Sequence, residues 1–331
     1  MATSARPVAL ITGASAGIGV ALAREAANDG HDLVLVARRR EPMEALAAEL
    51  KSMGAEITVI PADLSRPGAA AALMETVGQR GLAIDTLINN AGLGDTGRFD
   101  QENPEKILSM LQVNIIALTE LTRLVLPQMV ARKHGKVMLL ASLAAFQPGP
   151  GMAVYYATKA YVLSFGRAIG HELRGTGVTI TTLCPGPTTS EFAEVANMQG
   201  VALFEGPVPV MTAAEVARQG YAALKAGRSQ ITTGVINRIT AISTFHANAD
   251  LVDDCRSPQS TPWTRADMSS WCGSPCPLMG WSGRAPALPA REAGKGHQRR
   301  GAHHVIQGQV SSRGNRHRYR QELISLHWIT S

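Results

Sequence analysis

The sequence predicts an α/β protein in which a doubly wound parallel sheet has helices on both faces. Short, almost entirely apolar runs alternate with helix-length amphipathic segments from residue 7 to about residue 245, as expected for strands buried on both sides. Parallel strands joined by helices require right-handed crossovers, which build a doubly wound sheet. A glycine-rich segment also follows the first apolar run and precedes the first helical one.

Seven runs are expected to be strands, because they are short, aliphatic and bounded by turn residues. They are residues 7–12, 32–37, 56–61, 85–90, 135–142, 178–184 and 229–233. Helical periodicity marks the segments between them. These are residues 18–29, 41–53, 66–79, 104–132, 153–174 and 213–226.

The last quarter of the chain has a different composition. Residues 246–331 contain all four tryptophans, three of the four cysteines and six of the nine histidines, with almost no hydrophobic period. Such a segment cannot bury enough apolar surface to offset its chain entropy. We therefore expect one domain over residues 1–245 and a largely disordered tail over residues 246–331. An alternative origin for the tail is a GC-rich gene read in a shifted frame.

The formal net charge of +6 lies mostly in this tail, because residues 1–245 hold 21 Lys and Arg against 20 Asp and Glu. Specific nucleic-acid binding is therefore not expected of the domain. No apolar run reaches the roughly 18 residues of a membrane span, and the N-terminus makes a poor signal peptide. We expect a cytoplasmic protein without a membrane span. The tail contains four residues that could bind a metal: Cys272, Cys276, His303 and His304. Their spacing is irregular for zinc, so no metal site is expected.

Residues 12–19, TGASAGIG, join the first predicted strand to the first predicted helix. Gly13 permits a tight turn, Gly17 lets the backbone approach a phosphate, and Gly19 allows close packing of helix and strand. The N–H groups and positive end of the helix suit a pyrophosphate. In this context the segment predicts a dinucleotide site in a Rossmann fold; a purely structural turn is the alternative.

The second predicted strand ends in VLVARRR, residues 34–40. An acidic residue here marks NAD, whereas an arginine accommodates the 2′-phosphate of NADP. Ala37 occupies the acidic position and Arg38 follows it. A guanidinium can bind a phosphate bidentately. We therefore expect NADP(H), with NAD as the alternative, and a solvated basic turn remains open for Arg39 and Arg40.

Residues 155–161, YYATKAY, place three tyrosines and a lysine within two helical turns. Lys159 can share a helical face with Tyr155 or Tyr156, whereas Tyr161 points about 200° away and is expected to pack. An ammonium about 4 Å from a phenolate stabilises it by roughly 4 kcal/mol at an effective dielectric near 20. That energy predicts a tyrosine pKa lowered by roughly three units, before desolvation reduces the effect. Spacing alone does not choose between the first two tyrosines.

Taken together, residues 6–240 resemble the short-chain dehydrogenase/reductase family. The motifs that carry the resemblance are TGASAGIG (12–19), ADL (62–64), NNAG (89–92), VN (113–114), Ser142, YYATK (155–159) and PGPTTS (185–190). The resemblance implies a Rossmann fold and hydride transfer between NADP(H) and a small carbonyl or alcohol. It also selects Tyr155, because in the family three residues stand between the Tyr and the Lys, and the Tyr comes thirteen residues after the Ser.

The resemblance implies four catalytic residues. Tyr155 would protonate the developing alkoxide, and Ser142 would donate a hydrogen bond to the same oxygen. Lys159 would bind the nicotinamide ribose and tune the tyrosine, and Asn114 would position a water that relays protons to it. Each alone has a structural alternative: a strand cap, a helix polar residue or a solvated charge.

The resemblance also implies cofactor contacts. Asp63 and Leu64 would bind the adenine, Gly92 would leave room for the ribose, and Pro185 and Gly186 would meet the nicotinamide carboxamide. Of the two asparagines in NNAG, the second is the better candidate for holding the sheet together. The complete implied set is Gly13, Ser15, Gly17, Ile18, Gly19, Arg38, Asp63, Leu64, Asn89, Ala91, Gly92, Tyr155, Lys159, Pro185, Gly186 and Ser190.

Two expectations concern the periphery of the site. Residues 188–210 are expected to cover the substrate, and their apolar side chains favour a hydrophobic one: Met198, Val201, Leu203 and Phe204. A homodimer or homotetramer would use the helices near 104–132 and 153–174. The hydrophobic pattern fades after residues 235–244, where the family has structure that closes the pocket. The alternative function is therefore a protein that binds the cofactor but is catalytically silent.

Overall fold

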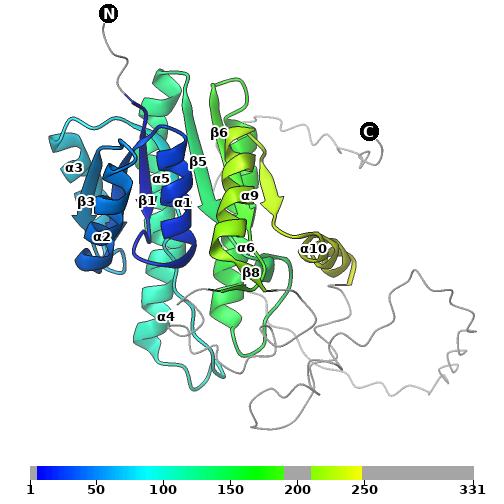
Figure 1. The fold of residues 1–331 in the computed structure, drawn as a ribbon. Helices are drawn as coiled ribbons and strands as arrows, with labels where there is room; N and C mark the ends of the chain where they lie inside the picture. The colour runs from blue at the N-terminus through cyan, green and yellow to red at the C-terminus, as the bar shows by residue number, and fades with distance from the viewer. Residues whose placement is uncertain (1–5, 190–209, 248–331) are drawn as a thin grey trace, which may run out of the picture. The chain divides into compact units, whose positions relative to one another are not determined.

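The computed structural model describes residues 6–189 and 210–247, with side chains through residue 241 (Figure 1). Its centre is a seven-stranded parallel sheet with the order β3-β2-β1-β4-β5-β6-β9. The strands are β1 (Val8–Thr12), β2 (Asp32–Ala37), β3 (Ile57–Pro61), β4 (Ile84–Asn89), β5 (Gly135–Leu140), β6 (Val178–Cys184) and β9 (Gln230–Thr232). All seven predicted strands and the doubly wound sheet are thus confirmed. The predicted tail beyond residue 247 lies outside the described residues and stays a prediction.

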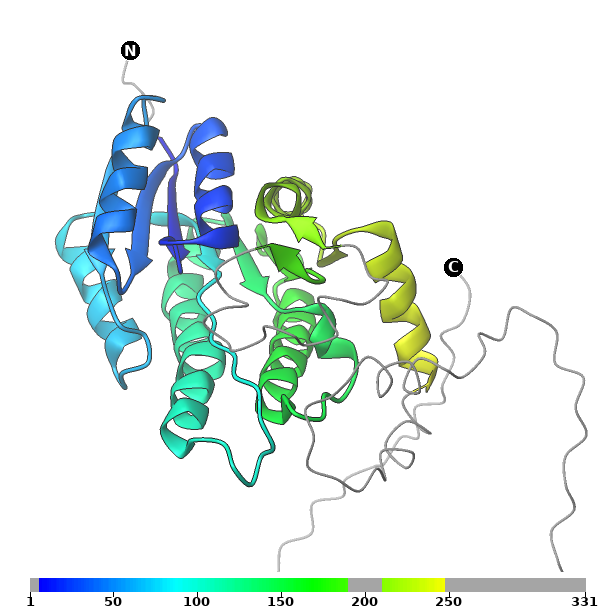
Figure 2. The same ribbon diagram turned by 60° about the horizontal axis from the view of Figure 1, so that its bottom comes forward.

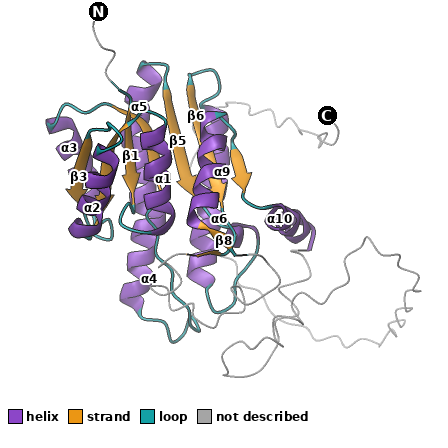
Figure 3. Ribbon diagram, in the orientation of Figure 1, coloured by secondary structure: helices purple, strands orange, loops and turns teal. Residues whose placement is uncertain are grey.

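Helices cover both faces of this sheet (Figures 2 and 3). One layer consists of α1 (Gly17–Asn28), α2 (Arg40–Lys51) and α9 (Ala213–Lys225). The other consists of α3 (Ala69–Gln79), α5 (Leu118–Ala131) and α6 (Ala153–Glu172). In β1, Ala9 and Ile11 belong to the first core and Leu10 to the second. Burial on both faces is the reason that the strands are apolar at successive positions.

The segment predicted as one helix over 104–132 contains a local change of winding. It comprises α4 (Pro104–Leu111), the π-helix η1 (Gln112–Ala117) and α5. By length and composition alone this stretch could cross a membrane, with a mean hydropathy of 1.3, and core helices of soluble proteins pass the same test. Leu121 and Met129 are fully buried in the core against the sheet, which accounts for the apolar composition.

Shorter elements complete the carboxyl side of the sheet. The 3₁₀-helix η2 (Leu143–Phe146) follows β5, and the short strands β7 (Thr188–Thr189) and β8 (Met211–Thr212) pair in parallel. α10 (Val235–Ala247) follows β9 and contacts η2. The strand order reverses between β1 and β4, and such a switch point leaves a crevice at the carboxyl ends of the strands.

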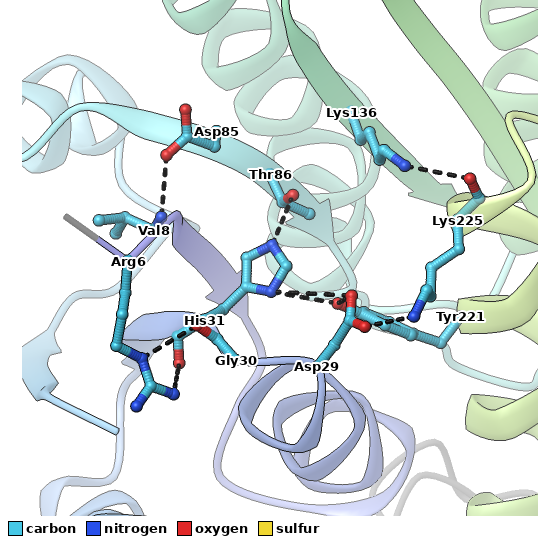
Figure 4. Close-up of polar contacts among 10 residues, drawn as sticks. All are labelled: Arg6, Val8, Asp29, Gly30, His31, Asp85, Thr86, Lys136, Tyr221 and Lys225. Atoms are coloured by element: carbon cyan, nitrogen blue, oxygen red, sulfur yellow. Dashed lines mark hydrogen bonds and ion pairs between the residues drawn. The ribbon is translucent and has the colours of Figure 1, made fainter. Parts of the chain in front are cut away.

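The opposite, amino-terminal edge of the sheet holds a polar network centred on His31 (Figure 4). Its imidazole lies 3.4 Å from the hydroxyls of both Thr86 and Tyr221. Tyr221 donates to Asp29 at 3.1 Å, and Lys225 also donates to this carboxylate. The network therefore joins the turn between α1 and β2 to β4 and α9 through hydrogen bonds between their side chains.

Candidate active site

A pocket of about 380 Å³ lies at the carboxyl ends of the strands. It gathers most of the residues predicted for the site, although they are spread along the sequence from Gly13 to Gly186. The predicted residues that line it are Gly13, Ser15, Gly17, Ile18, Arg38, Asp63, Leu64, Ala91, Gly92, Ser142, Tyr155, Lys159, Pro185 and Gly186. Gly19, Asn89 and Asn114 do not line it, and Ser190 lies outside the described residues, as do the predicted apolar residues between 198 and 204.

The glycine loop between β1 and α1 has the conformation that the sequence predicts. Gly13 and Gly17 have φ angles of 69° and 55°, which are readily adopted without a Cβ. A Cβ on Gly19 would overlap the carbonyl oxygen of Gly13, so this glycine permits close packing instead of lining the pocket. The N-cap residue Ala16 supplies no side-chain hydrogen bond, and the first turn of α1 has no acidic residue. An anion would complete this helix end favourably.

The end of β2 brings positive charge to the pocket. Arg38 and Arg39 both line it, next to the buried Ala37. The sequence left Arg39 and Arg40 open as a solvated turn, and the structure separates them. Arg40 forms an exposed ion pair with Glu44 at 3.1 Å, whereas Arg39 belongs to the pocket wall.

Asp63 follows β3 on the same side of the pocket. Its carboxylate accepts hydrogen bonds from the Ser65 hydroxyl at 2.7 Å and the Ser65 backbone N–H at 3.1 Å. These bonds lower the pKa of Asp63, and the charges of Arg38 and Arg66 lower it further. The carboxylate is therefore ionised at neutral pH and is oriented as a hydrogen-bond acceptor.

The two asparagines after β4 have different roles. The amide of Asn89 donates to the Thr122 hydroxyl at 3.0 Å and to the Leu118 carbonyl at 3.3 Å. It faces α5, so the expectation that Asn89 lines the cofactor site is wrong. The amide of Asn90 instead donates to the Thr12 carbonyl in β1 at 2.9 Å. As predicted, Asn90 holds β4 to β1, and it also lines the pocket.

Ser142 and Tyr155 meet in the interior of the pocket. β5 ends at Leu140, two residues before the predicted end. Ser142 caps η2, where its Oγ accepts from the Ala144 N–H at 3.1 Å. Its side chain also forms a hydrogen bond with Tyr155. Capping and contact with the tyrosine are therefore compatible roles for one hydroxyl.

Lys159 lies over the ring of Tyr155, with Nζ 5.7 Å from the ring centroid. Nζ also donates to the Leu140 carbonyl at 2.9 Å. Only 4% of the lysine is exposed. Burial lowers the pKa of Lys159 to about 8, because the desolvated ammonium is disfavoured. At neutral pH the ammonium still predominates.

The expected direction of the tyrosine pKa is corrected. Burial raises the pKa of Tyr155 to about 12, and the hydrogen bond with Ser142 opposes this rise without reversing it. The sequence argument expected desolvation to reduce the effect of the ammonium on the phenolate but not to exceed it. In the structure, desolvation of the phenol has the larger effect. Tyr155 is therefore a neutral hydrogen-bond donor at physiological pH.

Asn114 lies in η1 behind the pocket wall. Its Oδ1 accepts from the Leu93 N–H at 2.8 Å, and its Nδ2 donates to the Leu93 carbonyl at 2.9 Å. A Cβ on Gly92 would lie 3.4 Å from Lys159 Nζ and 3.5 Å from Asn114 Oδ1. The amide thus lies next to the lysine without lining the pocket itself.

Residues 7–199, more than half of the chain, match the sequence profile described as short chain dehydrogenase. The chain belongs to the short chain dehydrogenase family. Membership makes it an oxidoreductase of this type, with a nucleotide-binding Rossmann fold, and confirms the resemblance seen in its motifs. The agreement is independent of the pocket geometry, which brings the same motifs together.

Three known proteins illustrate the relationship. The ketoacyl reductase HetN of Nostoc sp. is 36% identical over 186 residues, which are 56% of this chain and 65% of HetN. A short-chain dehydrogenase from Sphingobium yanoikuyae, solved in complex with NADPH, is 33% identical with a TM-score of 0.65, over 77% of this chain and 98% of that one. A Burkholderia phymatum protein solved with NAD has a TM-score of 0.65 at 24% identity, over 78% and 98%, and shows the fold alone.

In this dehydrogenase an apolar cluster borders Tyr155. It contains Met110, Ala144, Met152 and Tyr156. The Tyr156 ring meets Tyr155 edge-on, with centroids 6.1 Å apart, and it is buried. The structure thus places Tyr156 in this buried cluster and leaves Tyr155 as the tyrosine of the pocket.

Leu93 and Thr188 are among the pocket residues that sequence reasoning missed. Leu93 lines the pocket one residue beyond the NNAG motif, and Thr188 lines it within PGPTTS. Thr188 donates to the Gly186 carbonyl at 2.9 Å. Its place inside a recognised motif was an available signal. For Leu93 the sequence offers none, because the leucine contributes through its backbone contact with Asn114.

Proposed function

We propose that the protein is an NADPH-dependent oxidoreductase that interconverts a carbonyl and an alcohol, with Tyr155 as general acid in the reducing direction. One observation carries the proposal: Ser142, Tyr155 and Lys159 line the same pocket as the glycine loop. A dinucleotide fits that loop, because the conformations of its glycines and the uncapped start of α1 suit a phosphate. When bound, NADPH supplies the hydride.

The protein residues manage the proton and the developing charge. Tyr155, neutral because its pKa is about 12, donates its proton to the substrate oxygen, which is far more basic as an alkoxide. Ser142 donates a hydrogen bond to the same oxygen. Lys159 carries a positive charge beside the tyrosine at neutral pH and stabilises the phenolate that remains. Asn114 positions the proton-relaying water that resupplies the lysine.

The proposed preference for NADPH over NADH rests on Arg38. The acidic position is occupied by the buried Ala37, and Arg38 and Arg39 line the pocket beside it. Two guanidinium groups favour a 2′-phosphate, whereas NAD has none to offer them. The Sphingobium yanoikuyae dehydrogenase, solved with NADPH, is consistent with this assignment.

The proposed substrate is a ketone or secondary alcohol with an apolar body. Met110, Met152 and Ala144 pack with Tyr155 in one apolar cluster next to the pocket, and apolar surroundings favour apolar ligands. HetN, a relative of this chain, is named a ketoacyl reductase. That name supports a carbonyl substrate.

We also propose a homodimer or homotetramer. The stretch from α4 to α5 exposes large apolar side chains: Leu108, Ile116 and Leu124, at 65%, 44% and 41%. A second copy would remove these side chains from water. Light scattering on the full chain measures the state, and a Leu108→Lys variant is expected to shift it towards monomer.

The central test compares NADPH oxidation by the full chain with that by Tyr155→Phe and Tyr156→Phe, over a panel of apolar ketones and aldehydes. Loss of a general acid is expected to reduce kcat by about 10² to 10⁴, so Tyr155→Phe should be almost inactive. Tyr156→Phe should retain turnover, because its ring packing is preserved. Equal turnover by the full chain and Tyr155→Phe would refute the role of this tyrosine. NADPH binding without turnover by the full chain would instead support the catalytically silent alternative.

A further inference from the structure

The hydroxyl of Thr158 connects two of the residues proposed for catalysis. Thr158 lies on α6 between Tyr155 and Lys159, and its side chain is fully buried. Oγ1 donates to the Tyr155 carbonyl oxygen at 2.7 Å and accepts from Nδ2 of Asn114 at 3.0 Å. Because the hydroxyl is both donor and acceptor, its orientation is fixed.

The Asn114 amide extends this connection to the pocket wall. It forms two hydrogen bonds with the backbone of Leu93, which lines the pocket. Asn114 lies in the π-helix η1, and such turns commonly occur at functional sites. A continuous chain of hydrogen bonds therefore runs from the Leu93 backbone through Asn114 and Thr158 to the Tyr155 backbone.

We propose that Thr158 is a positioning residue, whose hydroxyl sets where α6 presents Tyr155 and Lys159 relative to the pocket wall at Leu93. This inference rests on the proposed oxidoreductase function and adds a residue to it. Proton transfer requires donor and acceptor within hydrogen-bond reach. A displacement of about 1 Å can reduce the rate by about 10²-fold. A small change in the position of α6 therefore affects turnover before it affects folding.

Valine tests the hydroxyl, because it replaces threonine with nearly the same shape. In Thr158→Val the second N–H of Asn114 loses its acceptor and the Tyr155 carbonyl loses a donor. Buried polar groups left without partners shift or admit water. Thr158→Ser keeps the hydroxyl and removes only a methyl group, so it is the conservative rescue.

The chain offers a matched control on the same helix. Tyr161 and Thr119 form a hydrogen bond of 2.9 Å between α6 and α5. Neither residue lines the pocket. Tyr161→Phe therefore removes a hydrogen bond between neighbouring helices without touching Asn114 or Thr158.

Steady-state kinetics provide the first readout. Thr158→Val is expected to lower kcat by about tenfold or more, with the KM for NADPH within about twofold of the unsubstituted value. Thr158→Ser should recover most of this loss, and Tyr161→Phe should show none. The proposal is overturned if Thr158→Val keeps the full kcat, or if the kcat of Thr158→Ser is as low as that of Thr158→Val. An equal loss of kcat in Tyr161→Phe would also overturn it.

Amide hydrogen exchange provides a readout that does not depend on turnover. The Leu93 N–H donates to Asn114, so loosening the asparagine should accelerate its exchange in Thr158→Val. Exchange at Leu93 should stay unchanged in Tyr161→Phe and in Thr158→Ser. If the full chain reduces no carbonyl, the proposed function fails, and this measurement still decides the positioning role. Unchanged exchange at Leu93 in Thr158→Val would overturn it.

Discussion

Twice in the chain a lysine stands four residues after a tyrosine, and the two pairs lie at opposite ends of the sheet. Tyr155 and Lys159 lie on α6 at the carboxyl-end pocket. Tyr221 and Lys225 lie on α9 in the amino-end network (Figure 4). In the amino-end network both side chains are hydrogen-bonded to one carboxylate, that of Asp29.

The partners of the two pairs account for their different chemistry. Burial raises the pKa of Asp29, but the hydrogen bonds from Lys225 and Tyr221 outweigh it and lower the pKa. The amino-end lysine therefore has a fixed counter-ion. The carboxyl-end lysine has a neutral carbonyl and an aromatic ring as its partners. Helical spacing brings a tyrosine and a lysine together, and the surrounding charges decide whether the pair is structural or available for proton transfer.

Removing each lysine in turn is expected to separate the pairs most strongly. Lys159→Met should lower kcat/KM for NADPH-dependent reduction by about 10² or more, because the phenolate loses its neighbouring cation. Lys225→Met should retain activity. Lys225 is 54% exposed, and the loss of such an exposed ion pair should cost about 1 kcal/mol or less in the free energy of unfolding. Kinetics together with urea unfolding measure both; similar activity losses would show that the distinction is wrong.

The contrast between pocket-facing and internally paired charges extends to neighbouring arginines. Arg38→Leu is expected to weaken NADPH binding by about 10- to 100-fold, because a charge-assisted hydrogen bond is worth about 1.5–3 kcal/mol. NADH binding should be almost unaffected. Arg40→Leu is the control, since Arg40 pairs with Glu44. Fluorescence titration with both nucleotides measures the effect, and equal weakening of NADPH by the two variants would contradict the assignment.

Replacing a glycine by alanine should change the stability in opposite directions at the two ends of the sheet. Gly19→Ala places a methyl group 2.6 Å from the Asn90 amide, and overpacking of this kind destabilises by about 1–3 kcal/mol. Gly78 lies on the exposed side of α3 with nothing within 4 Å of an added Cβ. Gly78→Ala should raise stability by up to about 1 kcal/mol. Thermal unfolding checks both signs.

The smallest expected effect is a pH dependence of stability at the amino end. Burial lowers the pKa of His31, and the nearby carboxylates oppose this without reversing it. The folded state thus binds the histidine proton less readily than the unfolded state. Its stabilising contribution is present above the ordinary histidine pKa of about 6.5 and is lost as the pH falls below it. A His31→Gln variant should show a weaker loss of thermal stability over that range; an identical loss would place the titration elsewhere.

Much of the fold was predictable because the strands are buried on both faces and read as apolar runs. The π-helix η1 was not, because helical periodicity does not report a change of winding or the contact of Asn114 with the Leu93 backbone. The role of Asn89 was available in principle. Side chains alternate along a strand, and Leu87, two residues earlier, belongs to the core that contains α5.

The site was predictable as a set of residues but not as a set of charges. Local motifs located the glycine loop, Ser142, Tyr155 and Lys159. The raised pKa of Tyr155 could not be read from the same motifs. Desolvation depends on every atom packed around the phenol, and those atoms come from distant parts of the chain. Spacing reports neighbours along a helix and carries no information on burial.

The start of α1 has a consequence for the life of the protein in a cell. This helix begins with an alanine cap and no acidic residue, whereas α9 begins with a capping box between Thr212 and Glu215. A phosphate bound at the start of α1 would take the place of the missing cap. Nucleotide binding therefore stabilises the folded state by mass action. Molecules without nucleotide should then be the first to be captured by proteases. The abundance of the protein is thereby expected to follow the supply of dinucleotide.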